Sequence, residues 1–151
     1  EEDVTKIHLY FHKEKPEKEY FSLGISSDEF VITPFKKNTR VVAEDKITED
    51  IHLHSILPHM HFRGKEMKVL AILPNGDKKT LISVPDYDFN WQFIFNYQSP
   101  LFFPKGTILR AEGVFDNSYQ NPINPDPTQE VFSGNQSTDE MFIAFINYTI
   151  A

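Results

Sequence analysis

The stretch MKVLAILPNGDKKTLISV, residues 67–84, decides the fold class of this chain. Two short runs rich in apolar and β-branched residues, 67–73 and 79–84, flank the dipeptide Asn75-Gly76, which is typical of the tight turn of a β-hairpin. Asn and Gly suit the positive φ angles of a type I′ turn. We therefore predict two antiparallel strands that are joined at this turn and have a well-specified register.

Similar short runs recur along the chain, mostly about 8–12 residues apart and separated by turn signals. No long window keeps the 3.6-residue apolar period of a helix. The pattern predicts an all-β fold, a mostly antiparallel β-sandwich or jelly roll. The predicted strands are 5–11, 20–25, 30–32, 40–43, 51–56, 67–73, 79–84, 91–97, 107–115 and 141–149.

Three other stretches have a distinctive composition. FFPKGT (102–107) indicates a second tight turn, and DNSYQNPINPDPTQE (116–130) carries three prolines, so we expect a long ordered loop there. FNWQFIFNY (89–97) is rich in aromatic residues, which contribute much of the burial in small domains. We expect Trp91 and its aromatic neighbours to lie in the core.

Length and composition restrict the functional classes. The 151 residues fit one domain, 1–151, which would bury roughly 70% of the surface of its unfolded chain. The chain has no cysteine, which excludes disulfides and thiolate chemistry, and its net charge of -7 argues against a nucleic-acid partner. No apolar run approaches the ~20 residues of a membrane span. Because the chain begins at Glu1, we expect a fragment of a longer protein.

The segment HSILPHMHFRGK, residues 54–65, concentrates histidines. Residues i and i+2 of a strand face the same way, so His59 and His61 would present both imidazoles on one side of a sheet. Such an H-x-H pair is either a two-point clamp for a transition metal or two ordinary surface histidines. All six histidines lie within the first 61 residues, so a third ligand from the C-terminal half must be another residue type.

Three ligand sets could complete the pair. A cupin-like set would use Glu66 and a later histidine, but no histidine follows His61. A zinc site would add a carboxylate from Asp139 or Glu140. A copper site would add the thioether of Met141, a soft ligand that suits Cu(I) together with two imidazoles. Taken alone, Met141 also fits a core position.

Four stretches, in this order, resemble the C-terminal domain of the copper type II, ascorbate-dependent monooxygenases, and most of all its bacterial members. They are LPHMHFRGKEMKV (57–69), DYDFNWQ (86–92), FDNSYQNPINPDP (115–127) and STDEMFIAFINY (137–148). The animal members include peptidylglycine α-hydroxylating monooxygenase and dopamine β-monooxygenase. The resemblance runs from about Gly24 to Tyr148 and implies a jelly-roll β-sandwich, in agreement with the strand pattern.

The resemblance implies one copper ion held by His59, His61 and Met141, where dioxygen would be activated for hydroxylation of a substrate C–H bond. In the complete enzymes an upstream domain holds a second copper on three histidines and supplies an electron, with ascorbate as the reductant. These 151 residues do not contain that domain, and we do not assign its copper to His8 and His12. We expect an upstream domain in the full-length protein, an exported location (periplasmic or extracellular), and catalysis only when the two domains are joined.

Departures from the family pattern concern the substrate. Leu57, Ile143 and Phe145 stand where the animal peptide hydroxylase has a basic residue, an asparagine and a tyrosine near its peptide. The resemblance therefore supports copper binding more than peptide amidation, and it leaves open whether the substrate is a small molecule or a peptide. The alternative is a noncatalytic copper-binding or structural interaction module that keeps the fold without the chemistry.

Two further histidines alternate in EDIHLHS (49–55). If the strand runs on without a break through Pro58, His52 and His54 lie on the opposite face from His59 and His61. We expect them to have a structural or surface role, with a contact that orients the copper ligands as the sharper alternative.

Two acidic residues and one glycine adjoin the predicted ligands. Asp139 and Glu140 directly precede Met141, and we expect them to shape the approach of its strand. Arg63, Gly64 and Lys65 would form the turn that closes the ligand strand, with Gly64 at positive φ.

Overall fold

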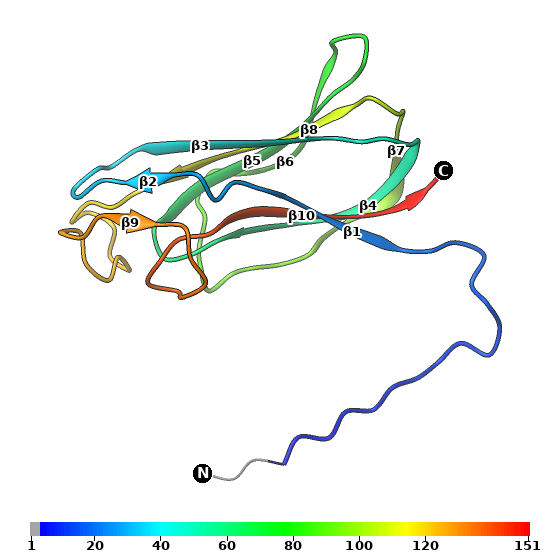
Figure 1. Cartoon of the computed structure of the whole chain (residues 1–151), viewed down its shortest axis with the longest axis horizontal. Helices are drawn as coiled ribbons and strands as arrows, with labels where there is room; N and C mark the ends of the chain where they lie inside the picture. The colour runs from blue at the N-terminus through cyan, green and yellow to red at the C-terminus, as the bar shows by residue number, and fades with distance from the viewer. Residues whose placement is uncertain (1–3) are drawn as a thin grey trace.

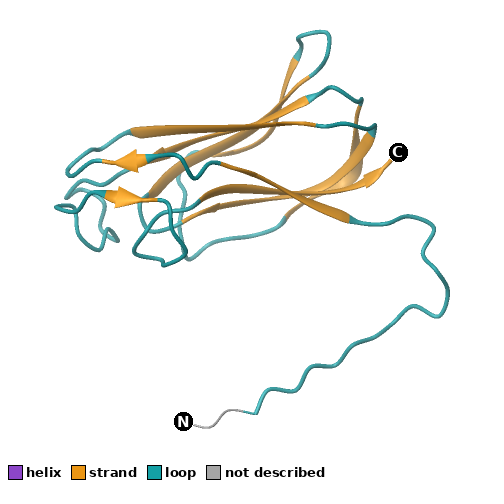
Figure 2. Cartoon of the chain, viewed as in Figure 1, coloured by secondary structure: helices purple, strands orange, loops and turns teal. Residues whose placement is uncertain are grey.

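The computed structural model describes residues 4–151, and this range contains strands, turns and loops but no helix (Figure 2). The all-β prediction is confirmed. The strands of the described range are β1 Phe21–Ser26, β2 Val31–Ile32, β3 Thr39–Lys46, β4 Ile51–Met60, β5 Gly64–Ile72, β6 Lys78–Val84, β7 Phe95–Phe103, β8 Ile108–Phe115, β9 Val131–Phe132 and β10 Phe142–Ile150.

Two four-stranded sheets face each other (Figure 1). Their strand orders are β1-β10-β4-β7 and β3-β8-β5-β6, every pairing within them is antiparallel, and the short strands β2 and β9 form a separate pair. The prediction of an antiparallel β-sandwich is confirmed, and its finer jelly-roll type stays a prediction.

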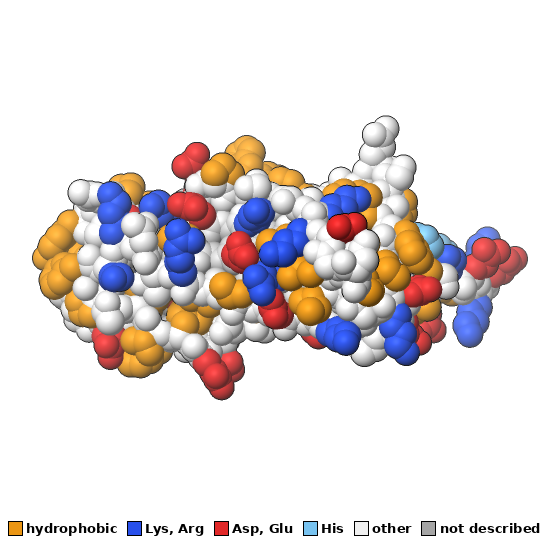
Figure 3. All heavy atoms as spheres, turned by 90° about the horizontal axis from the view of Figure 1, so that it is seen from above, with side chains coloured by type: hydrophobic (Ala, Val, Ile, Leu, Met, Phe, Trp, Pro, Cys, Tyr) orange, Lys and Arg blue, Asp and Glu red, His pale blue; other side chains and the backbone are white. Residues whose placement is uncertain are grey.

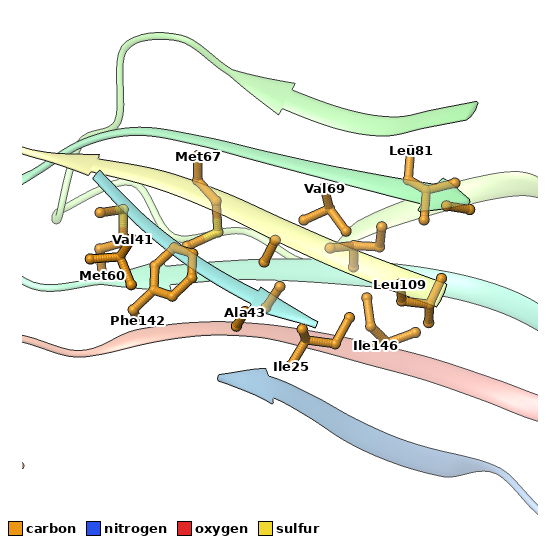
Figure 4. Packing of buried hydrophobic residues seen from close by; sticks show 14 of the residues in the cluster. Ile25, Val41, Ala43, Met60, Met67, Val69, Leu81, Leu109, Phe142 and Ile146 are labelled. Atoms are coloured by element: carbon orange, nitrogen blue, oxygen red, sulfur yellow. The ribbon is translucent and has the colours of Figure 1, made fainter. Parts of the chain in front are cut away.

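Apolar side chains fill the space between the sheets (Figure 4). Each such side chain stabilises the fold by roughly 1.5–3 kcal/mol when fully buried. Phe142 of β10 reaches Gly113 of β8 in the opposite sheet, and a Cβ at this glycine would overlap the Phe142 ring. β4 and β10 together contribute Ile51, Leu53, Ile56, Met60, Phe142, Ala144 and Ile146 to the core.

The β5–β6 hairpin is formed as predicted, but its turn differs from the predicted type. Gly76 has a φ of 90°, whereas Asn75 is not at positive φ, so the type I′ prediction is wrong. The Leu73 N–H donates to Asp77 O at 2.8 Å, and the loop takes in Pro74, Asn75 and Gly76. Pro74 has no N–H to donate to a partner strand, which explains why the loop is longer than two residues. The second predicted turn is confirmed, with Gly106 at a φ of 89°.

Two predicted strands differ from the structure. Residues 5–11 form no strand, and the exposed segment 4–20 extends away from the sandwich (Figure 1). β7 begins only at Phe95, and Trp91 is 68% exposed, so its predicted core position is wrong. The structure adds β9, which was not predicted, inside an otherwise irregular stretch that includes the expected loop 116–130.

The described residues include no helix with the length and apolarity that a bilayer crossing requires. On the face seen in Figure 3, basic and acidic side chains are interspersed.

Candidate metal centre

The outer face of β4 carries the histidines of interest. His54 is the extra residue of a β-bulge, because the register with β10 shifts between its two neighbours. An extra residue reverses the facing of the residues that follow it. Leu53 and Ile56 are both buried in the core, so His52, His54 and His59 all lie on the other, outer side of the sheet. The bulge interrupts the alternation along β4. The pair His52 and His54 therefore lies on the same face of the sheet as the pair His59 and His61.

His52 and His54 nonetheless make their contacts near the other end of β4. His54 Nε2 lies 3.1 Å from Thr149 Oγ1, and its ring centroid is 5.3 Å from that of Tyr20. The His52 ring lies 5.7 Å from Phe102. His54 and His59 lie five positions apart along the strand, which corresponds to about 16 Å. These contacts favour the structural role over an orienting contact with the H-x-H pair.

β10 brings Met141 to the H-x-H pair. The antiparallel register joins Phe142 to Met60 and the next residue of β10 to His59. Met141 directly precedes Phe142 and His61 directly follows Met60, so both residues adjoin this last pair of the ladder. Because Phe142 and Met60 both fill the core, their neighbours on either strand are directed to the outer face.

The two imidazoles have different surroundings. Their ring centroids lie 5.2 Å apart with an interplanar angle of 86°. His59 Nδ1 lies 2.5 Å from Gln92 Oε1, which fixes the ring and leaves Nε2 for another partner. His61 is 4% exposed, and within residues 4–151 its buried Nδ1 has no hydrogen-bond partner. Burial, with His59 nearby, lowers the pKa of His61 and favours the neutral imidazole that metals require.

Two imidazoles, of which His61 has a buried ring nitrogen without a hydrogen-bond partner among the described residues, and a thioether directly before the adjoining strand form a donor set that fits a copper ion.

Glu140 ties the start of β10 to the turn that follows the pair. Its buried carboxylate accepts the backbone N–H of His61 at 3.0 Å and that of Arg63 at 2.6 Å. Arg63 Nη1 also lies 3.8 Å from Glu140 Oε1. Burial raises the pKa of Glu140 to about 7 in spite of these donors. Glu140 thus joins the segment before β10 to the backbone of the facing segment through two hydrogen bonds.

Carboxylates do not complete the pair. Within the described range, no group of three or more His, Cys, Asp or Glu side chains is arranged to hold a metal ion. Asp139 Oδ2 instead accepts the backbone N–H of Gln136 at 3.2 Å, and the Glu140 carboxylate is bound to backbone amides. The zinc set is therefore not formed. This finding concerns only His, Cys, Asp and Glu, so it does not bear on a ligand set that includes Met141.

Three residues of the stretch 86–92, Tyr87, Phe89 and Gln92, contact the H-x-H segment. None of them was predicted to contact the histidine pair. The Tyr87 hydroxyl donates to Met60 O and accepts from the Met60 N–H, both at 2.8 Å. Met60 lies beyond Ile56, the last residue of β4 that pairs with β7. The Phe89 ring lies 6.1 Å from that of His61, and Gln92 binds the other imidazole. The only sequence signal for them was the stretch DYDFNWQ itself.

Arg63 joins the turn after the pair to the long loop 116–130. This side chain is 2% exposed, its Nε donates to Asn117 Oδ1 at 2.9 Å, and its Nη1 donates to Thr138 O at 2.8 Å. Asn121 Nδ2 donates to Phe62 O at 3.1 Å. The four stretches that carry the family resemblance therefore meet at one end of the sandwich, where the loops gather in Figure 1.

A turn follows the H-x-H pair as predicted, but Phe62 and Arg63 form it, and Gly64 and Lys65 already belong to β5. The Gly64 N–H donates to His61 O at 3.0 Å. Gly64 is not at positive φ, so that prediction is wrong. A Cβ at this position would lie 2.7 Å from Met60 Cβ, so glycine is required for close approach of the chain.

These features define a β-sandwich domain with imidazole and thioether donors gathered at one end of a sheet. The chain belongs to the copper type II ascorbate-dependent monooxygenase family, because the model of that family's C-terminal domain matches residues 20–150. The resemblance seen in the sequence is confirmed, and the family depends on copper and ascorbate.

Solved structures resemble the chain only distantly. The structure of the infectious bursal disease virus Gt strain has a TM-score of 0.39 and 10% identity, and the match covers 89% of this chain and 33% of the viral chain. A subviral particle of the same virus gives 0.40 and 12%, with the same coverage of 89% and 33%. The chain thus spans a third of these viral chains, and likeness at this level carries no functional argument. No curated protein matches the chain.

Proposed function

We propose that this domain holds one copper ion on His59, His61 and Met141. Copper bound there would supply the redox chemistry that activates dioxygen for hydroxylation of a substrate C–H bond. The observation that carries the proposal is the register of β4 with β10, whose last pair, Met60 with Phe142, directly adjoins His59, His61 and Met141 in the chain. Membership of a copper-dependent family supports the choice of metal.

The surrounding residues support copper through their effect on the donors. A soft sulfur with two imidazoles suits copper far better than magnesium or calcium. The lowered pKa of His61, caused by burial and by the nearby His59, favours the neutral imidazole that binds metals. Gln92 holds the ring of His59, and Glu140 holds the backbone on either side of Phe62. Donors held in place in this way lose little freedom on binding a metal.

The outer face beside His59 is apolar. Ile143 pairs directly with His59, Phe145 pairs with Leu57, and the Phe145 ring lies 6.4 Å from the His59 ring. Apolar neighbours favour an apolar part of the substrate near the copper and offer a peptide backbone no hydrogen bonds. The same residues favour the second candidate function, a noncatalytic copper-binding or interaction module, since they replace the polar groups of the animal peptide hydroxylase.

Catalysis in this proposal also needs an electron donor. We infer an upstream domain with a second copper in the full-length protein, ascorbate or another reductant as the electron source, and an exported location. Each of these rests on family membership. Fractionation of cells that produce the full-length protein tests the location, and cytosolic accumulation of the mature protein would contradict it.

The test of the copper site is an anaerobic Cu(I) titration of metal-free protein, followed by X-ray absorption at the copper edge. We expect one copper per chain with a sulfur neighbour. His59→Ala and His61→Ala should weaken Cu(I) binding at least about a hundredfold. Met141→Leu should remove the sulfur signal.

Two substitutions elsewhere are matched controls. Met67→Leu changes a methionine of the core, and His12→Ala changes a histidine of the exposed N-terminal segment. Both should leave the copper stoichiometry and the sulfur signal unchanged. Failure to bind stoichiometric copper, or binding that none of the three site variants alters, would refute the site.

Oxygen uptake by the full-length protein separates the two candidate functions. Ascorbate-dependent uptake that Met141→Leu abolishes supports the monooxygenase. Copper binding without such uptake supports the noncatalytic module.

A further inference from the structure

A solvent-open pocket of about 250 Å³ lies between the end of β6 and the start of β7. Four aromatic side chains and two carboxylates line it, together with apolar residues of β4 and β6. The aromatic residues are Tyr87, Trp91, Phe93 and Phe95, and the carboxylates are Asp86 and Asp88.

The aromatic walls are unusually accessible. Trp91 is 68% exposed, Phe93 49% and Phe95 43%. The rings of Trp91 and Phe93 meet at an interplanar angle of 61° with centroids 4.8 Å apart, which forms a corner. Exposed apolar side chains gathered around a concavity indicate a binding surface more often than a solvent-facing one.

The segment that carries this corner is held in place. Gln92, between the two aromatic residues, binds His59 through Oε1 and donates from Nε2 to Phe89 O at 2.8 Å. These two contacts fix the side chain of Gln92. The residues on either side of it, Trp91 and Phe93, line the pocket. Asp88 Oδ1 accepts the backbone N–H of Asn90 at 2.8 Å, which fixes one carboxylate at the wall. The pocket walls are thus largely preorganised.

The charge of the pocket has one sign. Its two charged residues are both acidic, and no Lys or Arg stands among the described residues that line it. The chain as a whole carries a net charge of -7, which adds to the attraction of cations. Aromatic faces attract a cation through the ring quadrupole, and most strongly so for tryptophan.

We propose that this pocket binds an organic cation, with an alkylammonium group seated against the aromatic faces and its charge balanced by Asp86 and Asp88. The volume is below the roughly 300–1,000 Å³ of pockets for drug-sized ligands, which fits a small headgroup. The site needs no copper, so it stands or falls independently of the proposed function.

The test compares choline with 3,3-dimethylbutan-1-ol, a neutral molecule of the same shape, on the metal-free full chain. Trp91 is the only tryptophan of the 151-residue chain, so the fluorescence of this chain reports on the pocket. We expect a saturable fluorescence change with choline and at least about tenfold weaker binding of the alcohol. Equal binding of the two would mean an apolar site, and no saturable change with choline would mean no site; either result overturns the proposal.

Variants separate charge and aromatic contributions. The double substitution Asp86→Asn with Asp88→Asn should weaken choline about fivefold or more. The matched control, Asp28→Asn with Glu29→Gln, makes the same charge change at exposed positions outside the pocket and should leave binding within about twofold. An equal loss in both would overturn the proposal in favour of nonspecific attraction.

Phe93→Leu keeps an apolar wall but removes a π face. It should weaken choline about fivefold and leave the alcohol unchanged. Proton–nitrogen NMR spectra of each variant establish that the sandwich remains folded, and an equal effect on both ligands would remove the cation–π basis of the proposal.

Discussion

At the scale of single residues, the histidine pair depends on neighbours that the local sequence does not identify. His59 is oriented by Gln92, which lies 33 positions further along the chain. The backbone of His61 is held by Glu140, which lies 79 positions away. Both contacts constrain groups that the proposed copper ion would need in place, so each can be tested by removing one side chain.

Gln92→Ala should weaken Cu(I) binding about tenfold, because His59 loses the hydrogen bond that fixes its ring. Competition with a coloured Cu(I) chelator measures the affinity. Gln98→Ala, at an exposed position of β7, is the control and should bind like the wild type. Equal affinity of Gln92→Ala and the wild type would show that this contact does not orient the ligand.

Glu140→Ala should lower the free energy of unfolding by about 3 kcal/mol at neutral pH, because two buried backbone N–H groups lose their acceptor and Arg63 loses its carboxylate partner. Urea unfolding followed by circular dichroism measures the change. Glu130→Ala, which alters an exposed residue, should change stability by less than about 0.5 kcal/mol. A similarly small effect at Glu140 would contradict its role as a clamp.

At the scale of elements, two features of the strands decide which side chains meet. The bulge at His54 brings all four histidines of the segment 52–61 to one side of the sheet. Close approach of the two sheets depends on Gly113, whose missing side chain leaves room for the ring of Phe142. Since Met141 directly precedes Phe142, packing between the sheets also helps to position the proposed sulfur ligand.

Gly113→Ala should destabilise the protein by about 1–3 kcal/mol, because the added methyl group would overlap the Phe142 ring in a packed core. Thermal and urea unfolding measure the loss. Gly24→Ala is the matched control in β1, where a Cβ would come no closer than 3.4 Å to its neighbours, and it should have little effect. Equal stability of the two variants would mean that the core adapts to the methyl group.

At the scale of the whole molecule, the two sheets are also joined at their edges. The Tyr97 hydroxyl of β7 donates to Leu81 O of β6 at 2.8 Å, and these strands belong to different sheets. Burial raises the pKa of Tyr97 to about 12. An unfolded phenol titrates near 10, so the two states bind protons differently only in the alkaline range.

We expect the free energy of unfolding to fall as the pH rises from about 10 to about 12, since the unfolded state releases the Tyr97 proton while the folded state keeps it. Tyr97→Phe should have a shallower pH dependence in urea unfolding over that range. Tyr10→Phe, in the exposed N-terminal segment, should retain the wild-type dependence. Parallel curves for Tyr97→Phe and the wild type would contradict the link between the sheets.

A chain shortened to begin at Tyr20 should unfold within about 2 °C of the full chain, because residues 4–19 are exposed and lie outside the sandwich (Figure 1). Calorimetry of both chains measures the difference. A clearly lower midpoint in the shortened chain would show that this segment contributes to the fold.

Much of the fold could be predicted because it depends on local patterns. Alternation with a period of two marks strands, and glycine and proline mark turns, within a few residues of one another. The same locality explains the errors. The alternation in 5–11 is that of a strand, yet the structure places no strand there, and the aromatic run that begins at Phe89 has the composition of a core, yet it lines a surface pocket.

The sequence by itself determined the all-β class, the β5–β6 hairpin and the kinds of donor atom that the H-x-H pair and Met141 offer. Only the tertiary structure decided that the histidine pairs share a face, that Gln92 contacts the His59 ring and Glu140 the backbone of His61, and that Met141 directly precedes the strand beside them. The physical reason is that the register of β4 with β10 joins segments about 80 residues apart, and it is set by core packing and by a bulge that no local pattern encodes.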